Sequence, residues 1–269
     1  MVLDALAAPF RILVWQRAAI RTFVQREIRT RYATSAMGIG WTVIRPLSLL
    51  VLYTFIFSRV LRVKFGDSGS TSDFAFILFC GLVPWLAFSD GLTRATTAIT
   101  DQAQLVKRIR FPSEILPVHQ VLVALVIESV GLLILLAGLV VAGRPPGWTL
   151  VLLLPVLLPQ FLFTTGLAWT LAALSVFLPD IRHLVVFGLT FWMYGTPIFY
   201  PLHQVPDRIE WVFRLNPLTY VVEAYRAAVI DHRGLELVPY GAFCAVSLVM
   251  FIAGYWVFQR FKYEFPDVL

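Results

Sequence analysis

Three long stretches of this chain contain no charged side chain: residues 145–179, 183–206 and 237–259. Each is long enough to cross roughly 30 Å of hydrocarbon as an α-helix, which takes about 20 residues. The stretches are continuously apolar and do not alternate every second residue, as the strands of a membrane barrel do. Because a helix satisfies its own backbone hydrogen bonds in lipid, the sequence predicts an all-α membrane protein.

The rest of the sequence supports a bilayer as the solvent. Charged residues make up only 14% of the chain and the mean hydropathy is +0.78, whereas soluble domains carry about 25% charged residues. Three further apolar stretches are interrupted by one or two polar groups, which brings the expected number of spans to six. The predicted spans of a 35–265 membrane domain are residues 35–58, 74–98, 116–142, 149–176, 183–200 and 238–260.

The distribution of lysine and arginine predicts the orientation of these spans. An even number of spans places both termini on one side, and that side carries more cations than the other. The cations of the opposite side fall mainly in the long connection before the last span, where carboxylates are interspersed. We therefore expect a multi-pass protein of the plasma membrane with both termini in the cytoplasm. The net charge of +6 is explained by attraction to anionic lipid headgroups, because the cations flank the spans. We expect no binding of nucleic acid.

Residues 1–34 are predicted to form an amphipathic helix in the membrane interface. Apolar residues such as Ile20 and Phe23 share one face, and polar residues repeat every four positions on the other. This helix is either a simple anchor for the first span or a surface that also faces a cytoplasmic partner. The polar face consists of Arg17, Arg21, Gln25 and Arg29.

Motifs for catalysis and cofactor binding are missing from the sequence. No GxxxxGK[ST] occurs and none of the three lysines follows a glycine, so the chain has no phosphate-binding loop of its own. No HExxH, GxSxG or CxxC occurs, and Cys80 and Cys244 fall inside predicted spans, as small buried side chains. We expect no metal and no cofactor on this chain. A membrane glycosyltransferase or phosphotransferase is the alternative from another class of protein, and it would need catalytic carboxylates.

The stretch LVKRIRFPSEILP, residues 105–117, separates two predicted spans. Its cations cannot enter lipid cheaply, so it must lie in water or against protein. Pro112 ends one segment, and Ser113 with Glu114 can begin the next helix. Cations and prolines between two spans are also typical of an ordinary positively charged cytoplasmic loop.

Arg45 in the first predicted span and Glu128 in the third are charged residues with no opposite charge one helical turn away. Each would cost about 2.5 to 3.5 kcal/mol facing lipid on insertion scales. They either form an ion pair with each other or face a water-filled path. Asp90 and Arg94 lie four residues apart on one helical face and are expected to neutralise one another.

Five stretches taken together resemble one known family. In order they are VQREIRTRYATSAMGIGWTVIRPLSLLVLYTFIFSRV, FILFCGLVPWLAFSDGL, LVKRIRFPSEILP, FLPDIRHLVVFGLTFWMYGTPIFYPLHQVP and LNPLTYVVEAYRAAVI. They are similar to the permease subunit of polysaccharide ABC exporters, which carry O-antigen, capsule or teichoic acid and belong to the type-two ABC exporter class. The resemblance extends from about Val24 to Phe265.

The resemblance implies a transport permease that is not an enzyme. It implies a second copy of this chain, two ATP-binding subunits that hold the ATP and Mg, and a lipid-linked polysaccharide as the transported substrate. A type-two exporter of a small lipid or drug is the alternative within transport. Residues 101–111 would form a coupling helix that rests in a groove of the ATP-binding subunit, with Asp101, Gln104, Lys107, Arg108, Arg110 and Phe111 as its contacts.

Aromatic residues in the spans are candidates for lining a polymer path, together with Arg45. The resemblance implies contact with an anionic pyrophosphate lipid headgroup as the functional alternative to an Arg45–Glu128 ion pair. A ring face stacks on sugars without requiring one pattern of hydroxyls, although aromatic residues also collect at membrane interfaces and fill apolar bundles. The candidate lining consists of Tyr53, Phe57, Trp85, Trp192 and Tyr194.

Residues 201–233 are predicted to form two short re-entrant helices between spans five and six. The segment contains several prolines, and its apolar runs are too interrupted for a full crossing. In the resembled family such helices close the pore on the outer side, although a simple outer loop is the alternative. The expected gate residues are Asn216 and Pro217, at the bend between the two helices, and Glu223, Tyr225 and Arg226, near the exit.

Overall fold

The computed structural model describes residues 2–31, 33, 37–60, 71–107 and 111–269. All regular secondary structure in these ranges is helical, which confirms the predicted class. The α-helices are α1 (Val2–Trp15), α2 (Arg17–Thr30), α3 (Trp41–Thr54), α4 (Thr71–Thr97), α5 (Ala103–Val106), α6 (Ile115–Val141), α7 (Leu153–Phe177), α8 (Ile181–Tyr194), α9 (Asp207–Leu215), α10 (Pro217–Val229), α11 (Leu237–Lys262) and α12 (Phe265–Val268).

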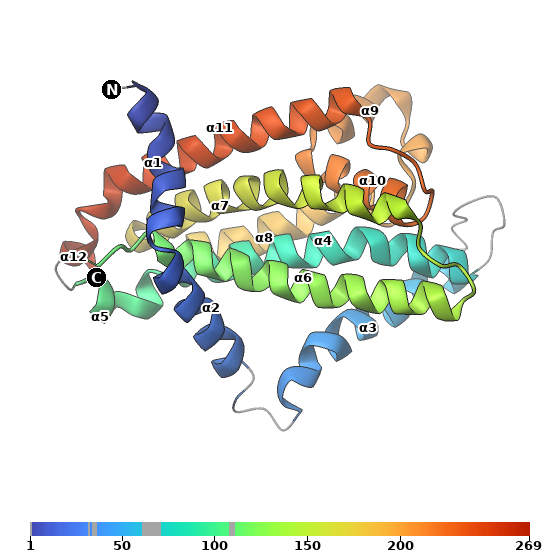
Figure 1. The fold of residues 1–269 in the computed structure, drawn as a ribbon, viewed down its shortest axis with the longest axis horizontal. Helices are drawn as coiled ribbons and strands as arrows, with labels where there is room; N and C mark the ends of the chain where they lie inside the picture. Colours follow the sequence, from blue (N-terminus) through green and yellow to red (C-terminus); the bar gives the residue numbers. More distant parts are fainter. Residues whose placement is uncertain (1, 32, 34–36, 61–70, 108–110) are drawn as a thin grey trace.

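Four long helices, α4, α6, α7 and α11, form the body of the molecule (Figure 1). Their apolar segments, which are each long enough to cross a membrane, are Phe74–Thr97, Ile115–Val141, Trp148–Phe177 and Leu237–Lys262. These segments match four of the predicted spans. The predicted first and fifth spans are shorter apolar helices, Trp41–Thr54 and Ile181–Tyr194. Length and composition therefore identify four candidate spans in the described part of the chain.

The long helices have two ends that differ in what they carry. We call one the α5 end, where α5, α12 and the C terminus lie, and the other the α9 end (Figure 1). α6 begins at the α5 end with Ile115, three residues after Pro112, and Glu114 is its N-cap residue, in agreement with the predicted helix start. The Glu114 carboxylate accepts hydrogen bonds from Gln259 and Lys262, both at 2.6 Å. These bonds hold the end of α11 against the start of α6.

A close backbone contact joins α7 to α11 at two glycines. A Cβ added to Gly254 would overlap the Gly166 carbonyl oxygen, and a Cβ added to Gly166 would overlap the Met250 carbonyl oxygen. Small residues allow such backbone contact, which is how helices associate in a membrane without a hydrophobic driving force. The contact positions the two helices that carry much of the α5-end core.

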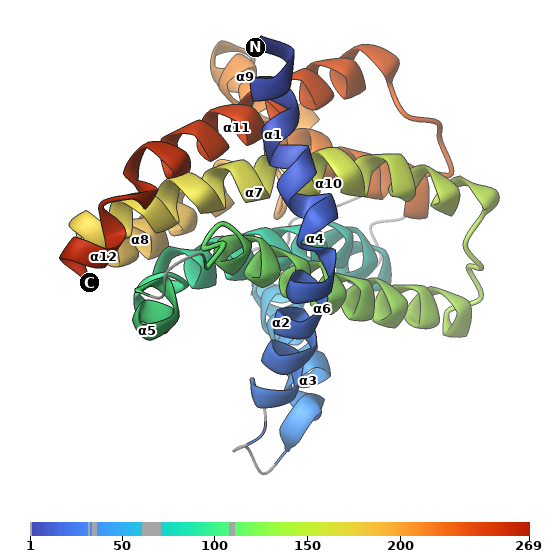
Figure 2. The same cartoon turned by 60° about the vertical axis from the view of Figure 1, so that its left-hand side comes forward.

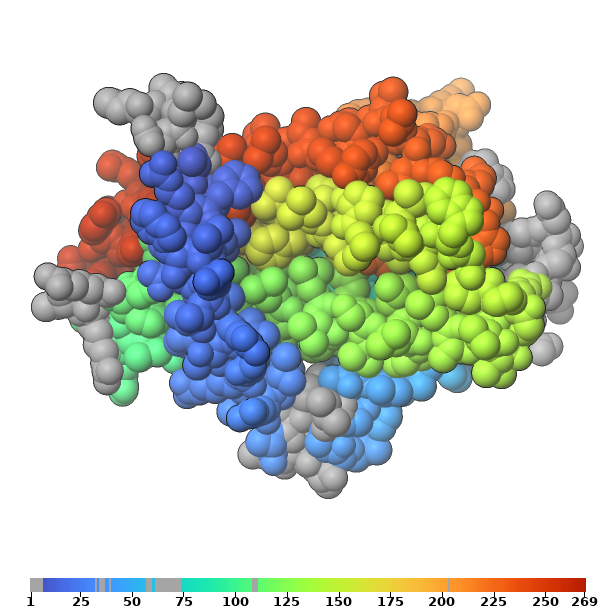
Figure 3. Space-filling view, viewed as in Figure 1, coloured from blue at the N-terminus to red at the C-terminus, as the bar shows by residue number. Residues whose placement is uncertain are grey.

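The predicted 1–34 helix is divided in the structure. α1 ends at Trp15 and α2 begins at Arg17, and Figures 2 and 3 show both helices crossing the outside of the long helices. Phe10 of α1 packs on Phe251 of α11, with ring centroids 5.0 Å apart. Phe23 of α2 lies 5.4 Å from the His119 ring of α6. The direction changes because each half follows a different helix of the body.

We predict that Gly254→Ala destabilises the protein by about 1–3 kcal/mol, because the new methyl group forces α7 and α11 apart. The measurement is the thermal midpoint of the detergent-purified protein, followed by size-exclusion fluorescence. Gly241→Ala is the matched control, since it lies on the same helix and a Cβ there meets nothing within 4 Å. Equal midpoints for the two variants would contradict the contact.

Candidate functional site

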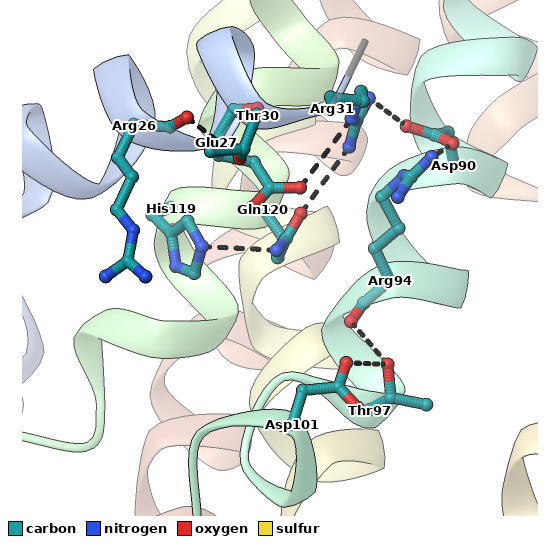
Figure 4. Close-up of polar contacts among 10 residues, drawn as sticks. All are labelled: Arg26, Glu27, Thr30, Arg31, Asp90, Arg94, Thr97, Asp101, His119 and Gln120. Carbon is teal, nitrogen blue, oxygen red and sulfur yellow. Dashed lines mark hydrogen bonds and ion pairs between the residues drawn. The ribbon is translucent and has the colours of Figure 1, made fainter. Parts of the chain in front are cut away.

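One polar cluster lies between α2, α4 and α6, toward the α5 end. Arg31, directly after α2, donates from Nη1 to Asp90 Oδ2 at 2.8 Å and from Nη2 to Gln120 at 3.5 Å. Arg94 donates from Nε to Asp90 Oδ1 at 3.0 Å, so the predicted Asp90–Arg94 pair is present. Figure 4 shows both guanidiniums directed at the same carboxylate. We call Arg31, Asp90, Arg94 and Gln120 the Arg31 cluster.

The predicted coupling segment continues from this cluster along α4. Thr97 donates to Asp101 at 2.8 Å, within two turns of Asp90 on the same side of the chain (Figure 4). Asp101, Gln104 and Lys107 are exposed at the α5 end. Phe111 is half-buried, with its ring 6.1 Å from that of Phe23 in α2. Arg108 and Arg110 lie outside the described residues. The segment thus has polar side chains exposed at the α5 end and contacts α2 through an aromatic pair.

The polar stripe of α2 faces away from the bundle. Ile20 is buried against the α5-end core, while the other face is exposed. Exposed on it are Arg17, Arg21, Gln25 and Arg29.

Glu128 is at the middle of α6 and is buried, with an exposed fraction of 3%. Its Oε1 accepts from the Tyr225 hydroxyl at 2.5 Å, and its Oε2 accepts from Gln160 Nε2 at 2.9 Å. The possible ion pair with Arg45 is not formed among the described residues. Arg45 is exposed on α3, although it and Glu128 line the same pocket. A buried carboxylate needs such donors, and here they come from α7 and α10.

The predicted bend at Asn216 and Pro217 separates α9 from α10. The Asn216 side chain caps α10 by accepting from the Leu218 amide at 3.0 Å, and Pro217 is the first residue of the helix. Trp192 of α8 donates to the same amide oxygen at 2.8 Å. The bend is therefore tied to the end of α8.

α10 is packed into the bundle and carries the remaining predicted gate residues. Tyr225 is fully buried, because its hydroxyl reaches inward to Glu128. The Arg226 side chain is buried too and donates to the Ile198 carbonyl at 2.8 Å and to Glu223 at 2.9 Å. Glu223 keeps 41% of its side chain exposed. Of these three residues, Glu223 is therefore the one directed to the surface.

The predicted path aromatics occupy different surroundings. Tyr53 packs edge-on against Phe199 at 5.0 Å, and exposed Tyr194 lies 5.7 Å from the same ring. Trp85 is buried in the core, 5.7 Å from Phe88. The side chain of Phe57 lies outside the described residues. Tyr53 and Tyr194 are thus brought together, while Trp85 is part of the packing of the subunit.

The sequence analysis assigns no role to three residues of these clusters, Arg31, Gln120 and Gln160. Arg31 is one of many N-terminal cations, and its partner Asp90 is 59 residues away, so no local pattern connects them. Gln160 is a strongly polar side chain in an uncharged stretch, which is a usable signal for a buried contact. Within the described residues, no group of three or more His, Cys, Asp or Glu could hold a metal ion.

Comparison with known proteins gives consistent matches over most of the chain. Residues 18–230 match the model of the ABC-2 type transporter family. The chain is 32% identical to the O-antigen export system permease protein RfbA of Myxococcus xanthus, over 96% of this chain and 97% of that protein. It is 25% identical to RfbA of Klebsiella pneumoniae, over 91% and 92%. It is 26% identical to the polysialic acid transport protein KpsM of Escherichia coli, over 89% and 93%.

We predict that Tyr225→Phe lowers stability by about 1–3 kcal/mol, because it removes a donor from a buried carboxylate. The thermal midpoint of the purified protein measures this loss. Tyr263→Phe is the control, since that side chain is 81% exposed. Equal changes of the thermal midpoint in the two variants would contradict a stabilising Tyr225–Glu128 hydrogen bond.

Proposed function

The chain belongs to the ABC-2 type transporter family, and from this membership we propose that it is the permease subunit of a polysaccharide exporter. The observation that carries the proposal is the near full-length similarity to the O-antigen export permease of Myxococcus xanthus. The permease moves a lipid-linked polysaccharide out of the cytoplasm across the inner membrane. Energy comes from ATP hydrolysis on a separate subunit, because this sequence contains no phosphate-binding loop of its own.

Six spans per subunit complete the proposed membrane domain. α3 is extended by a π-helical segment, Phe55–Val60, so that helix runs continuously from Trp41 to Val60. That is about 30 Å at 1.5 Å per residue, enough to cross the hydrocarbon. α8 supplies the fifth span, and α9 with α10 enter from the outside and return. The α5 end, with both termini, faces the cytoplasm.

The α5 end is the proposed contact with an ATP-binding subunit, two of which belong to the assembly. Exposed Asp101, Gln104 and Lys107 lie on the short segment between α4 and α6. α4 carries this segment and also contacts α10. A push on the segment, driven by ATP binding, can thus reach the helices of the α9 end through a rigid span. The exposed basic stripe of α2 widens the same docking surface.

A second copy of the chain completes the proposed pore. α8 has one buried residue, Leu189, and exposes large apolar side chains that include Leu184, Phe187 and Phe191. In a membrane such a face borders lipid or another protein, and closed two-fold assembly is the commonest arrangement for identical subunits. Tyr53 and Tyr194, with Arg45, are the proposed path-lining residues of the described side chains.

The function is tested by deleting the gene and measuring surface polysaccharide. We expect lipid-linked polymer to accumulate inside the cell and the surface polymer to be lost, with recovery when the gene is restored. Vesicles that contain the purified chain should transport polymer only with the ATP-binding subunit and ATP. Transport by the chain alone would refute the proposal.

We predict that reversing three charges, Lys107→Glu, Arg108→Glu and Arg110→Glu, abolishes coupling. Like-charge contacts across an interface cost several kcal/mol, so co-purification with the ATP-binding subunit should fall at least about tenfold. The measurements are the amount of bound subunit and ATP-driven transport in vesicles. Arg208→Glu is the control, an exposed cation at the start of α9, at the opposite end of the bundle. Unchanged binding and transport in the triple variant would contradict this role.

A further inference from the structure

A pocket lies where α2, α3, α4 and α6 meet. It extends from Arg94, within one turn of the α5 end of α4, to Glu128 at the middle of α6. Its volume is about 70 Å³, which is room for about five water molecules at roughly 10–15 Å³ each. This space accepts a small polar group and excludes a whole lipid or a sugar chain.

Three guanidiniums line this pocket, and the first of them, Arg31, is held in place. Only 4% of its side chain is exposed, and its two terminal nitrogens donate to Asp90 and Gln120. Its Nε makes no hydrogen bond and lies 3.7 Å from the Glu27 carboxylate. A buried guanidinium with an unused donor favours a further acceptor nearby.

The other two guanidiniums, Arg45 and Arg94, are less constrained. Arg94 uses only Nε on Asp90 and keeps 39% of its side chain exposed. Among the described residues, no ion pair joins Arg45 to a carboxylate. Arg45 therefore brings a full set of donors to the pocket from α3.

The two carboxylates that line the pocket already accept hydrogen bonds from protein donors. Asp90 accepts from Arg31 on one oxygen and from Arg94 on the other. Glu128 is engaged by Tyr225 and Gln160. The lining thus has more donors than acceptors and more guanidiniums than carboxylates. A phosphate group fits this lining, because guanidiniums bind its oxygens with paired, charge-assisted hydrogen bonds.

The surroundings indicate that the phosphate belongs to a lipid. On α3, Leu52 lies two turns beyond Arg45 on the same face and is 50% exposed, and Leu47 and Val51 on the adjoining face are 37% and 69% exposed. This apolar surface runs along the helix away from the pocket, as a lipid tail would. A free anion would contact only the pocket, whereas a lipid would contact the pocket with its headgroup and the apolar surface with its tail.

We propose that the pocket binds the phosphate-bearing headgroup of a lipid, with Arg45 and Arg94 as the donors that adapt to it and Arg31 as the fixed one. The inference rests on the proposed function, since the pocket then lies in the cytoplasmic half of the bilayer, where a lipid-linked substrate enters. The lipid is either the carrier of the polymer or an ordinary anionic phospholipid.

The test measures binding of fluorescent decaprenyl diphosphate to the complex of this chain and its ATP-binding subunit in neutral-lipid nanodiscs. Arg45→Gln and Arg94→Gln should each weaken binding about 10- to 100-fold, the worth of a charge-assisted hydrogen bond. Arg45→Lys should recover part of the loss. Arg182→Gln is the control, an exposed cation of α8 outside the pocket, and should bind like the parent protein.

Competition identifies the source of the headgroup. Displacement by unlabelled decaprenyl diphosphate but not by phosphatidylglycerol assigns the pocket to the carrier lipid, and equal displacement by both assigns it to anionic phospholipid. Displacement by inorganic pyrophosphate as effectively as by the lipid would overturn the lipid assignment.

Parent-like binding by both glutamine variants would overturn the pocket itself. If polymer export still occurs in that case, the proposed function stands without the pocket. Arginine-dependent binding without any export would instead remove the proposed function.

Discussion

A single buried carboxylate determines how the centre of the bundle is arranged. Glu128 cannot lie between apolar helices without donors, and it obtains them from Gln160 of α7 and Tyr225 of α10. Three helices are therefore joined at one point, and one of them is short. Because Tyr225 must reach inward, α10 is drawn into the body of the molecule. Its burial then places Arg226 against the Ile198 carbonyl, which ties α10 to the segment after α8.

The same requirement for satisfied polar groups acts at the α5 end. Asp90 joins Arg31 and Arg94, and Glu114 joins Gln259 and Lys262. These two contacts connect α2 with α4, and α6 with α11, next to the short segment that would receive a partner. A force applied there acts on helices that are already linked by charged side chains. These contacts link α2, α4, α6 and α11 at the α5 end, and α4 in turn contacts α10.

Several local features were predictable because they depend on neighbouring residues. The start of α6 follows from Pro112, the Asp90–Arg94 pair follows from a spacing of four, and the bend before α10 follows from Asn216 and Pro217. Contacts between distant residues were not predictable in this way. The sequence suggested Arg45 as a partner for Glu128 on charge alone. The structure selects Tyr225 and Gln160, since helix packing brings these two within hydrogen-bonding distance.

The amino-acid sequence by itself determined that this is an all-helical membrane protein of a transporter family, because long uncharged stretches allow only helices in lipid and because the motifs occur along nearly the whole chain. It also determined where polar connections interrupt the spans. Only the tertiary structure decided which face of each helix is buried, that Gly166 and Gly254 allow α7 and α11 to touch, and that Arg31, Arg45 and Arg94 line one pocket. The physical reason is that nearly every face of these helices is apolar. Hydrophobic pattern therefore does not distinguish one face from another, and packing together with a few buried polar contacts makes the choice.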